Sequence, residues 1–365
     1  MPSWPFPNVA PMFGGRVALV VLAAVLLVAG SSNSTVAEAS GNPLAGVRLY
    51  VDHHSPAWHQ MRAYRRSGQR RKAALIRRIA REPRALWFGR FTRPHFRKKV
   101  RRQIVRAKRR RAVPVLTVMR AEANHCGPWY TGGGPAEDAR TRAWYRRFAR
   151  RIGRARVVIA FEPDSLGTID CQARSRRDDR IRLLRYGVKR FARLPNATVY
   201  LDAGASDWEP AWRTARQLRA IGIARVRGFM LNATHYDWTR ANIRHGLRIS
   251  RLTGGKHFVI DTSGYGRGPV HYRRSNGRSI TVWCNPGMRG LGTPPTTSTS
   301  NPMVDAYLWI NRPGYTQRCQ GRRIAWYAPR ALAYARHATH WEGPPRGSRY
   351  GYRKRYPFSM FARSR

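Results

Sequence analysis

The sequence predicts an α/β protein built on a closed or nearly closed parallel barrel. Short, continuous apolar runs recur along the chain, and longer amphipathic stretches separate them. Continuous apolar runs are typical of strands buried on both faces, and their alternation with helices indicates βα units around a parallel sheet. Seven or eight such units without an internal linker favour a barrel over an open, doubly wound sheet. No Gly-x-Gly-x-x-Gly follows the first run, so the fingerprint of a dinucleotide-binding fold is missing.

The predicted strands are rich in Val, Ile, Leu and Phe, which suit a pleated and buried surface. In chain order they are Val47–Val51, Leu86–Gly89, Val113–Val118, Val157–Phe161, Ala197–Leu201, Val226–Leu231, His257–Asp261 and Val304–Ile310.

The predicted helices lie between these strands and carry apolar residues at spacings of three and four. In chain order they are Ala57–Arg81, Pro94–Arg110, Glu137–Arg151, Arg176–Arg193, Glu209–Ile221 and Thr239–Leu252.

The N-terminus has the pattern of an export signal. Val17 to Gly30 form an uninterrupted apolar run, which is short for a membrane span, and Ala37-Glu38-Ala39 offers a small-x-small cleavage site. We expect residues 1–39 to be a signal peptide or an uncleaved anchor, 40–342 to form the barrel, and 343–365 to be a basic, disordered tail. Either form of the N-terminus predicts a protein that is secreted or associated with the cell surface.

The charge of the chain is strongly positive. Its 365 residues contain 70 Lys and Arg against 18 Asp and Glu, a formal net charge of +52, while 42% of the residues are hydrophobic. This excludes an acidic protein, and the apolar content argues against a basic disordered one. Nucleic-acid or polyanion binding is the competing functional class, because 22 Lys or Arg lie between Met61 and Arg111.

The spacing of these basic residues favours a different interpretation. They surround apolar Leu75, Ile76, Val100 and Ile104 at helical intervals, as on the solvated outer faces of barrel helices. We therefore expect no specific nucleic acid partner. An acidic cell-surface polymer, attracted through the diffuse field of the protein, is the better electrostatic candidate.

The four cysteines are far apart, and none forms a Cys-x-x-Cys pair, which argues against a metal site. In an oxidising compartment they predict two disulfides, with three possible pairings. We favour Cys126 with Cys171 and Cys284 with Cys319, because each bond would join neighbouring loops at one end of the fold.

Polar residues follow several predicted strands at the point where the strand ends. Glu162 and Asp164 come after the fourth strand, Asp202 after the fifth, Asn232 after the sixth, and Asp261 ends the seventh. In a parallel barrel the chemistry lies at this edge, where the loops after the strands converge. An Asp at the end of a strand can equally cap a helix or form a turn. Four such positions in a chain with few acids favour an active site.

Ordered blocks along the chain resemble the family 6 glycoside hydrolases, endoglucanases and cellobiohydrolases that cleave β-1,4-glucan with inversion. The agreement runs from about Asn42 to Ala338. The blocks include Glu162-Pro163-Asp164-Ser165, Tyr200-Leu201-Asp202-Ala203-Gly204, Gly228-Phe229-Met230-Leu231-Asn232, Trp283-Cys284-Asn285-Pro286 and Val304-Asp305-Ala306-Tyr307-Leu308-Trp309-Ile310. The resemblance implies a distorted, seven-stranded parallel α/β barrel of the family 6 cellulase type, with its active site in a tunnel or cleft and with the same two disulfides.

The resemblance also implies roles for single residues. Asp164 matches the general acid that protonates the glycosidic oxygen, and Asp202 matches a second carboxylate near the cleavage point. Trp87 and Trp283 match aromatic platforms for glucose rings, Asn232 matches a substrate hydrogen-bonder, and Trp208 is a further candidate platform. The implied partner is a β-glucan polysaccharide or oligosaccharide. We expect a monomer that needs no metal ion or cofactor.

Two blocks depart from the family pattern. His125 stands where the family has an Asp that helps set the pKa of the acid. Near residue 315 the pattern Lys-x-Pro-Gly-Glu-x-Asp-Gly-Cys becomes Asn311-Arg312-Pro313-Gly314-Tyr315-Thr316-Gln317-Arg318-Cys319. The candidate base is therefore replaced by Gln317. Asn311 and Tyr315 replace the Lys and Glu of a sugar subsite, where we expect them to contact substrate.

Inverting hydrolysis needs a base that faces the acid across about 6.5–9.5 Å, and an amide such as Gln317 cannot accept the proton. Three interpretations follow. In the first, another group is the base: His125, with Glu122, or Asp202 through water, as alternatives. In the second, the substrate differs from plain cellulose. In the third, the protein is a glycan binder with weakened or absent turnover.

Overall fold

The structure is a computed structural model that describes residues 41–89, 95–121, 134–273, 279–287, 289–317 and 324–339. The described residues from Pro43 onward belong to one compact unit. The predicted export segment and the predicted basic tail, residues 1–39 and 343–365, lie outside the described residues. In the part that is described, no helix is both long and apolar enough to span a membrane.

Seven parallel strands form one sheet in the order β1-β2-β3-β4-β5-β6-β9. They are β1 (Leu86–Gly89), β2 (Val115–Met119), β3 (Val157–Phe161), β4 (Ala197–Asp202), β5 (Gly228–Leu231), β6 (His257–Asp261) and β9 (Val304–Leu308). The sheet curls so that its two edges meet. The N–H of Ala85, just before β1, donates a hydrogen bond of 2.8 Å to the carbonyl of Trp309, just after β9. The predicted distorted barrel of seven strands is confirmed.

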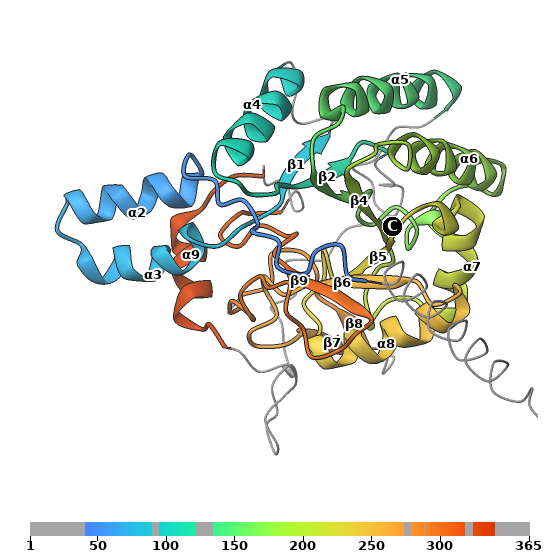
Figure 1. The fold of residues 1–365 in the computed structure, drawn as a ribbon. Coiled ribbons are helices and arrows are strands. Elements are labelled where there is room, and N and C mark those ends of the chain that lie inside the picture. Colours follow the sequence, from blue (N-terminus) through green and yellow to red (C-terminus); the bar gives the residue numbers. More distant parts are fainter. Residues whose placement is uncertain are drawn as a thin grey trace, which may run out of the picture. The chain divides into compact units, whose positions relative to one another are not determined.

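Helices follow the strands and cover the outside of the sheet (Figure 1). They are α2 (Pro56–Arg66), α3 (Arg70–Ala80), α4 (Phe96–Arg109), α5 (Pro135–Ile152), α6 (Arg174–Phe191), α7 (Ala211–Ile221), α8 (Thr239–Leu252) and α9 (Ala328–Arg336). A short antiparallel pair, β7 (His271–Arg273) and β8 (Ser279–Thr281), lies in the long connection between β6 and β9.

Two predicted elements differ from the structure, and three observed elements were not predicted. The expected strand Val47–Val51 makes only one bridge, between Leu49 and Val113. The expected single helix Ala57–Arg81 is two helices, α2 and α3, because Gly68 adopts a positive φ of 72° and turns the chain back. The pair β7–β8 and helix α9 were not predicted, since short strands and a nine-residue helix give a weak periodic signal.

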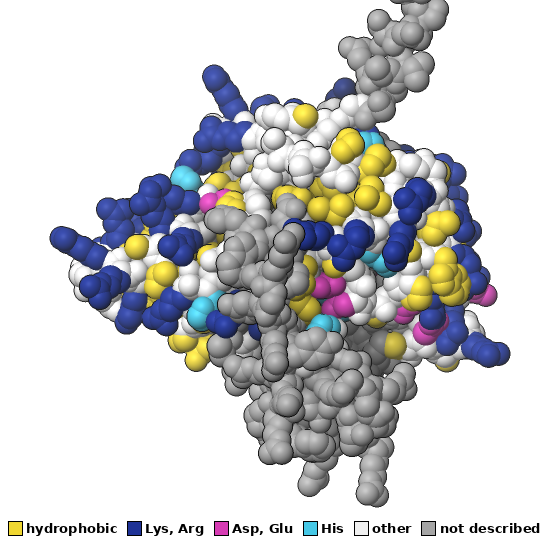
Figure 2. All heavy atoms as spheres, turned by 90° about the horizontal axis from the view of Figure 1, so that it is seen from below, with side chains coloured by type: hydrophobic (Ala, Val, Ile, Leu, Met, Phe, Trp, Pro, Cys, Tyr) yellow, Lys and Arg dark blue, Asp and Glu magenta, His cyan; other side chains and the backbone are white. Residues whose placement is uncertain are grey.

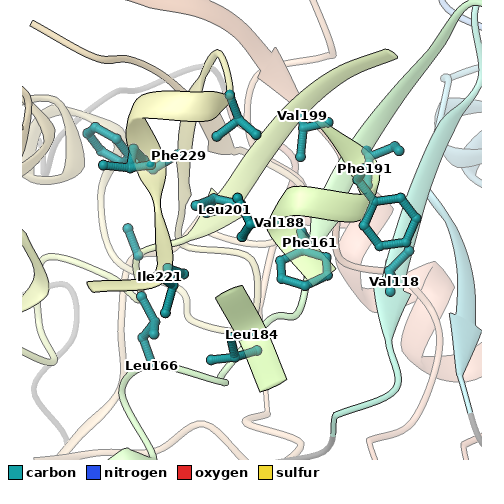
Figure 3. Packing of buried hydrophobic residues seen from close by; sticks show 14 of the residues in the cluster. Val118, Phe161, Leu166, Leu184, Val188, Phe191, Val199, Leu201, Ile221 and Phe229 are labelled. Atoms are coloured by element: carbon teal, nitrogen blue, oxygen red, sulfur yellow. The ribbon is translucent and has the colours of Figure 1, made fainter. Parts of the chain in front are cut away.

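Apolar side chains fill two layers, one on each side of the sheet. An inner layer, which includes Val158, Met230 and Val259, fills the barrel. The outer layer lies between the sheet and the helices, and Figure 3 shows Leu184, Val188 and Phe191 of α6 near Phe161 of β3. Strand residues alternate between the two layers, which explains why the strands are continuously apolar.

Basic side chains lie on the solvated faces of the helices, as their spacing predicted. On α3, Arg70, Arg71 and Arg77 are exposed, whereas Ile76 and Ile79 are buried. Figure 2 shows Lys and Arg side chains gathered on the side of the molecule where α2 and α3 lie. The positive charge is therefore largely a property of the outer helix faces.

Candidate active site

The polar residues predicted at strand ends meet at one edge of the sheet. Phe161 pairs with Leu201, and Asp202 pairs with Met230, so the loops after β3, β4 and β5 start at neighbouring positions. Glu162, Asp164 and Asn232 have positive φ values of 54°, 68° and 67°. Such backbone conformations are strained for residues other than glycine and cluster at functional sites. The edge is thus built to present particular side chains.

Asp164 is partly exposed at this edge, whereas Glu162 and Asp202 are buried. The Thr234 hydroxyl, from the loop after β5, donates a hydrogen bond to its Oδ1. Burial raises the pKa of Asp164, and the Thr234 hydrogen bond and the charge of His235 lower it only in part. The carboxyl group can therefore reach a ligand and also holds its proton more strongly than an ordinary Asp does.

Asp202 lies beside Asp164 but is only 3% exposed. Burial, followed by the charge of Asp164, raises the pKa of Asp202 well above its usual value, although backbone hydrogen bonds from Gly204 and Asp164 oppose the shift. The Gly204 N–H donates to Oδ1 of Asp202 over 3.4 Å. Two adjacent carboxyls resist a second negative charge, so the pair holds one proton up to a higher pH than two isolated carboxyls would.

Glu162 anchors the end of β2. Its carboxylate oxygens accept hydrogen bonds from the N–H groups of Arg120 and Ala121 at 2.9–3.0 Å, and from the Tyr145 hydroxyl at 2.6 Å. Burial raises the pKa of Glu162 to about 7 against the effect of these bonds. Arg180 also binds the carbonyl of Ala121. These contacts fix the start of the segment that carries Glu122, His125 and Cys126, which lie outside the described residues.

His235 and Asp207 form a pair at this site that the sequence analysis missed. His235 Nδ1 lies 2.9 Å from Asp207 Oδ1. Burial alone would lower the pKa of His235, but the hydrogen bond and charge of Asp207, with the charge of Asp164, raise it. Thr234 links the same loop to Asp164, so an imidazole whose charged form is favoured lies near the acid. The sequence gives only a weak indication that His235 and Asp207 pair, because the two residues are 28 positions apart on different loops.

Trp208 lies on the other side of His235. The two rings stack with centroids 4.8 Å apart and planes inclined by 17°. The Trp208 ring also lies against Gly167, where a Cβ atom would come within 2.5 Å of it. Trp208 and the 58% exposed Trp212 line an open hollow of about 800 Å³ beside the loop after β4. Trp212 is an exposed ring that the sequence analysis did not single out.

Asn232 and Asp261 hold neighbouring loops together. The Asn232 amide donates to the carbonyls of Asp237 and Asp261 at 3.0 and 3.1 Å, and its Oδ1 accepts from the Asp237 N–H. Both hydrogens of this 1% exposed amide are thus used inside the protein, so none is available for the predicted contact with a sugar. Asp261 accepts bonds from Ser263 and from the N–H of Asn311, and burial raises its pKa to about 7.

Asn311, Tyr315 and Trp87 come together where the edges of β1 and β9 meet. Trp87 Nε1 donates to the carbonyl of Ile310 over 2.6 Å. The Arg312 guanidinium lies 4.7 Å from the centre of the Trp87 ring and 5.2 Å from that of Tyr315. A sugar on Trp87 would therefore meet a cation as well as an aromatic ring.

Gln317 joins the segment after β9 to the loop of Trp283. Its Oε1 accepts from the Asn285 N–H at 2.8 Å, and its own N–H donates to Asn285 Oδ1 at 2.7 Å. Trp283, two residues before Asn285, is 50% exposed. The residue at the family's base position thus makes a reciprocal pair of hydrogen bonds between two loops.

Two of the four cysteines belong to the described residues. None of the cysteines that the structure describes, Cys171 and Cys284, is a free thiol. Cys126 and Cys319 lie outside the described residues, so the pairing stays a prediction. Within the ranges that are described, no group of His, Cys, Asp or Glu has an arrangement suited to a metal ion.

Comparison with known proteins gives consistent results. A model of "Glycosyl hydrolases family 6" matches residues 44–328. Endoglucanase A of Cellulomonas fimi is 34% identical over 295 residues, which cover 80% of this chain and 61% of that protein. Endoglucanase 1 of Streptomyces halstedii is 33% identical over 254 residues, which cover 68% of this chain and 74% of that protein. The chain thus spans under two thirds of the first relative and more of the second.

Solved structures agree with the sequence relatives. The endoglucanase Cel6 from Mycobacterium tuberculosis, in complex with methyl-cellobiosyl-4-deoxy-4-thio-β-D-cellobioside, has a TM-score of 0.72 and 36% sequence identity. That match covers 81% of this chain and 99% of the other. Endoglucanase CEL6B from Humicola insolens, with a TM-score of 0.68 and 19% identity, shows the same fold. Because the family model and relatives above 30% identity cover most of its length, the chain belongs to the glycosyl hydrolases of family 6.

Proposed function

We propose that this protein is an exported glucanase that hydrolyses β-1,4-glucosidic bonds of cellulose or a related β-glucan with inversion. Membership of family 6 and the endoglucanase relatives support the reaction class. The thio-linked cello-oligosaccharide bound to the Mycobacterium tuberculosis protein supports a β-glucan substrate. The observation that carries the proposal is the pair of neighbouring carboxyls, with Asp164 partly exposed and Asp202 buried beside it.

Asp164 acts as the general acid. Its raised pKa keeps a proton available, and Thr234 holds the carboxyl group in place. In the reaction, Asp164 gives this proton to the glycosidic oxygen as the bond from C1 to that oxygen breaks. A water molecule attacks C1 from the opposite face of the sugar, and a base takes the proton that the water releases. The C1 configuration is inverted because bond breaking and attack occur on opposite faces.

His125 is the proposed base, since an imidazole near pH 6.5 can accept a proton and Gln317 cannot. Glu122, or Asp202 through a water molecule, are the alternatives. Asp202 is a weaker candidate, because burial and the charge of Asp164 favour the protonated form of its carboxyl group. Falling activity of the wild type below a pKa of about 6.5, with loss of activity in His125→Ala, is the expected signature.

Aromatic and polar residues along the edge bind the sugar chain. Trp283 and Trp208 provide rings against the apolar faces of sugars, and Trp87, Asn311 and Tyr315 lie at the meeting of β1 and β9. Asn232 is left out of this set, because its amide is used within the protein.

A glycan binder without turnover is the second candidate, and the hydrogen bonds of Gln317 favour it. Because Gln317 holds two loops together through these bonds, it contributes to the shape of the site and not to proton transfer. Binding of cello-oligosaccharides without release of reducing ends would identify this function.

The experiment is reducing-sugar release from carboxymethylcellulose and mixed-linkage β-glucan. We expect turnover by the wild type and a loss of at least about 10²-fold in Asp164→Asn, as for removal of a general acid. Asp178→Asn, at an exposed position on α6, is the matched control and should retain full activity. Equal activity in Asp164→Asn and the wild type would refute the assignment of the acid, and a wild type that binds but never hydrolyses would leave the second candidate.

A further inference from the structure

Two arginines and two aromatic rings meet where the edges of β1 and β9 approach each other. We call Arg84, Trp87, Arg312 and Tyr315 the seam cluster. Arg312 lies over both rings, at 4.7 Å from the Trp87 centroid and 5.2 Å from the Tyr315 centroid. Arg84 interacts electrostatically with Arg312 and with Tyr315. All four side chains are partly exposed, so a ligand can reach them.

The backbone around the seam cluster is fixed from both sides. Ala85 donates to Trp309 at 2.8 Å, and Trp87 Nε1 donates to Ile310 at 2.6 Å, which ties β1 to the end of β9. The next residue, Asn311, donates its N–H to Asp261 at the end of β6, and its Oδ1 accepts from the Arg312 N–H at 2.8 Å. The cluster therefore lies on the same edge of the sheet as the carboxyl pair, in a defined arrangement.

We propose that the seam cluster binds a carboxylate-bearing sugar, so that the natural substrate is a β-1,4-glucan that contains uronic acid residues. This inference rests on the proposed function, because it takes the edge of the sheet to be the sugar site. A guanidinium group matches a carboxylate with two parallel hydrogen bonds, while an aromatic ring supports the apolar face of the same sugar. A uronic acid offers both features, since its carboxylate projects from the rim of the ring.

The charges of the cluster fit an anionic sugar better than a neutral one. The pKa of Arg312 is lowered to about 10, mainly by burial; Tyr315 opposes this shift and the nearby Arg84 charge adds to it. A carboxylate between the two guanidinium groups would offset their repulsion. Asp52 is an acid that acts electrostatically on Arg84, and its oxygens accept bonds from the His54 N–H and from Gln103.

Neutral residues at two positions remove negative charge from the same segment. Tyr315 and Gln317 stand where the family pattern has a Glu and an Asp. Carboxylates there would repel a uronic acid, whereas a phenol and an amide do not. The two changes and the presence of Arg312 all alter the site in the direction that an acidic sugar requires.

Isothermal titration calorimetry in the Asp164→Asn background tests this inference without turnover. The probes are a β-1,4-linked tetrasaccharide of glucuronic acid and cellotetraose, at low ionic strength. We expect the acidic tetrasaccharide to bind at least tenfold more tightly, and Arg312→Gln to abolish this preference. Arg101→Gln removes one charge from an exposed position on α4 and should leave the preference unchanged, which separates the cluster from the diffuse field of the protein.

Several results would overturn the inference: cellotetraose binding as tightly as the acidic tetrasaccharide, neither sugar binding, or a preference that persists in Arg312→Gln. Near-ultraviolet circular dichroism checks that Arg312→Gln is folded. If it is not folded, Arg84→Gln replaces it in the same test. Because binding needs no turnover, this result is independent of whether the wild type hydrolyses any glucan. An active enzyme with no acidic preference would refute the inference and leave the proposed function intact.

Discussion

His235 Nδ1 lies 2.9 Å from Asp207 Oδ1, on two different loops, while the residue before His235 donates its hydroxyl hydrogen to Asp164. This places an imidazole whose charged form is favoured near Asp164, the proposed general acid. A positive charge favours the ionised form of a carboxyl group, so His235 lowers the pKa of Asp164 against the larger effect of burial. The pair thereby influences the pH range in which Asp164 keeps its proton.

Replacing the imidazole should move the pH profile of the enzyme. In His235→Gln the pKa of Asp164 should rise, because the charge that lowered it is lost. Activity that depends on protonated Asp164 falls as pH rises through that pKa, so the alkaline limb of kcat should move to higher pH. The measurement is kcat against pH from 4 to 9 for both proteins. If kcat falls but the limbs of its pH profile stay at the same pH, His235 only supports the fold.

The same pair makes a prediction for stability. The Asp207 carboxylate raises the pKa of His235 above its usual 6.5. A raised histidine pKa contributes stability that is complete below the unfolded value and is lost as pH rises through the folded value. In Asp207→Asn the His235 resonance should therefore titrate at lower pH by NMR, and the free energy of unfolding should fall by about 1 kcal/mol near pH 6 and less near pH 9. A His235 titration that is the same in both proteins would contradict the assigned ion pair.

Asp202 should also make the protein less stable as pH rises. Its folded pKa is raised well above the unfolded value, so the native state holds a proton that the unfolded chain releases. The free energy of unfolding then falls as pH rises between the two values, with a slope of up to about 1.4 kcal/mol per pH unit. Asp202→Asn removes this slope, and urea denaturation should find the variant gaining stability relative to wild type between pH 5 and pH 8. Asp178→Asn, at an exposed site, should follow the wild type at both pH values.

The strands and their polar ends could be predicted from the sequence because each carries a local signal. A run such as Val157–Phe161 is buried on both faces, and an acid that follows it is conspicuous in a basic chain. The break between two helices at Gly68 could not be predicted, because the amphipathic spacing continues from α2 into α3. The partnership of His235 and Asp207 depends on β4 and β5 pairing side by side, and the placing of Arg312 over Trp87 depends on the two edges of the sheet meeting.

Asp305 is the clearest case of a buried acid that has a structural role. Within β9 it is 0% exposed, and it accepts two hydrogen bonds of 2.8 Å from Arg227 and one of 2.7 Å from the Tyr200 hydroxyl, with His257 Nδ1 at 3.1 Å. Arg227 precedes β5 and His257 begins β6, so this group lies at the opposite end of the strands from Asp164. Its substitution should therefore affect the fold and not the chemistry.

Asp305→Asn should lower the free energy of unfolding by about 3 kcal/mol, because the variant leaves the Arg227 charge partly buried without its counter-ion. The value is at the low end of the range for broken buried pairs, since Arg227 keeps 17% of its side chain exposed. Urea denaturation at pH 7 measures the loss, and kcat/KM at 20 °C should stay within about twofold of the wild type. Asp179→Asn removes an acid from the exposed side of α6, where it pairs with Arg176 and Arg182, and should cost no more than about 1 kcal/mol. If both substitutions cost the same, the buried group stabilises the barrel no more than a surface ion pair does.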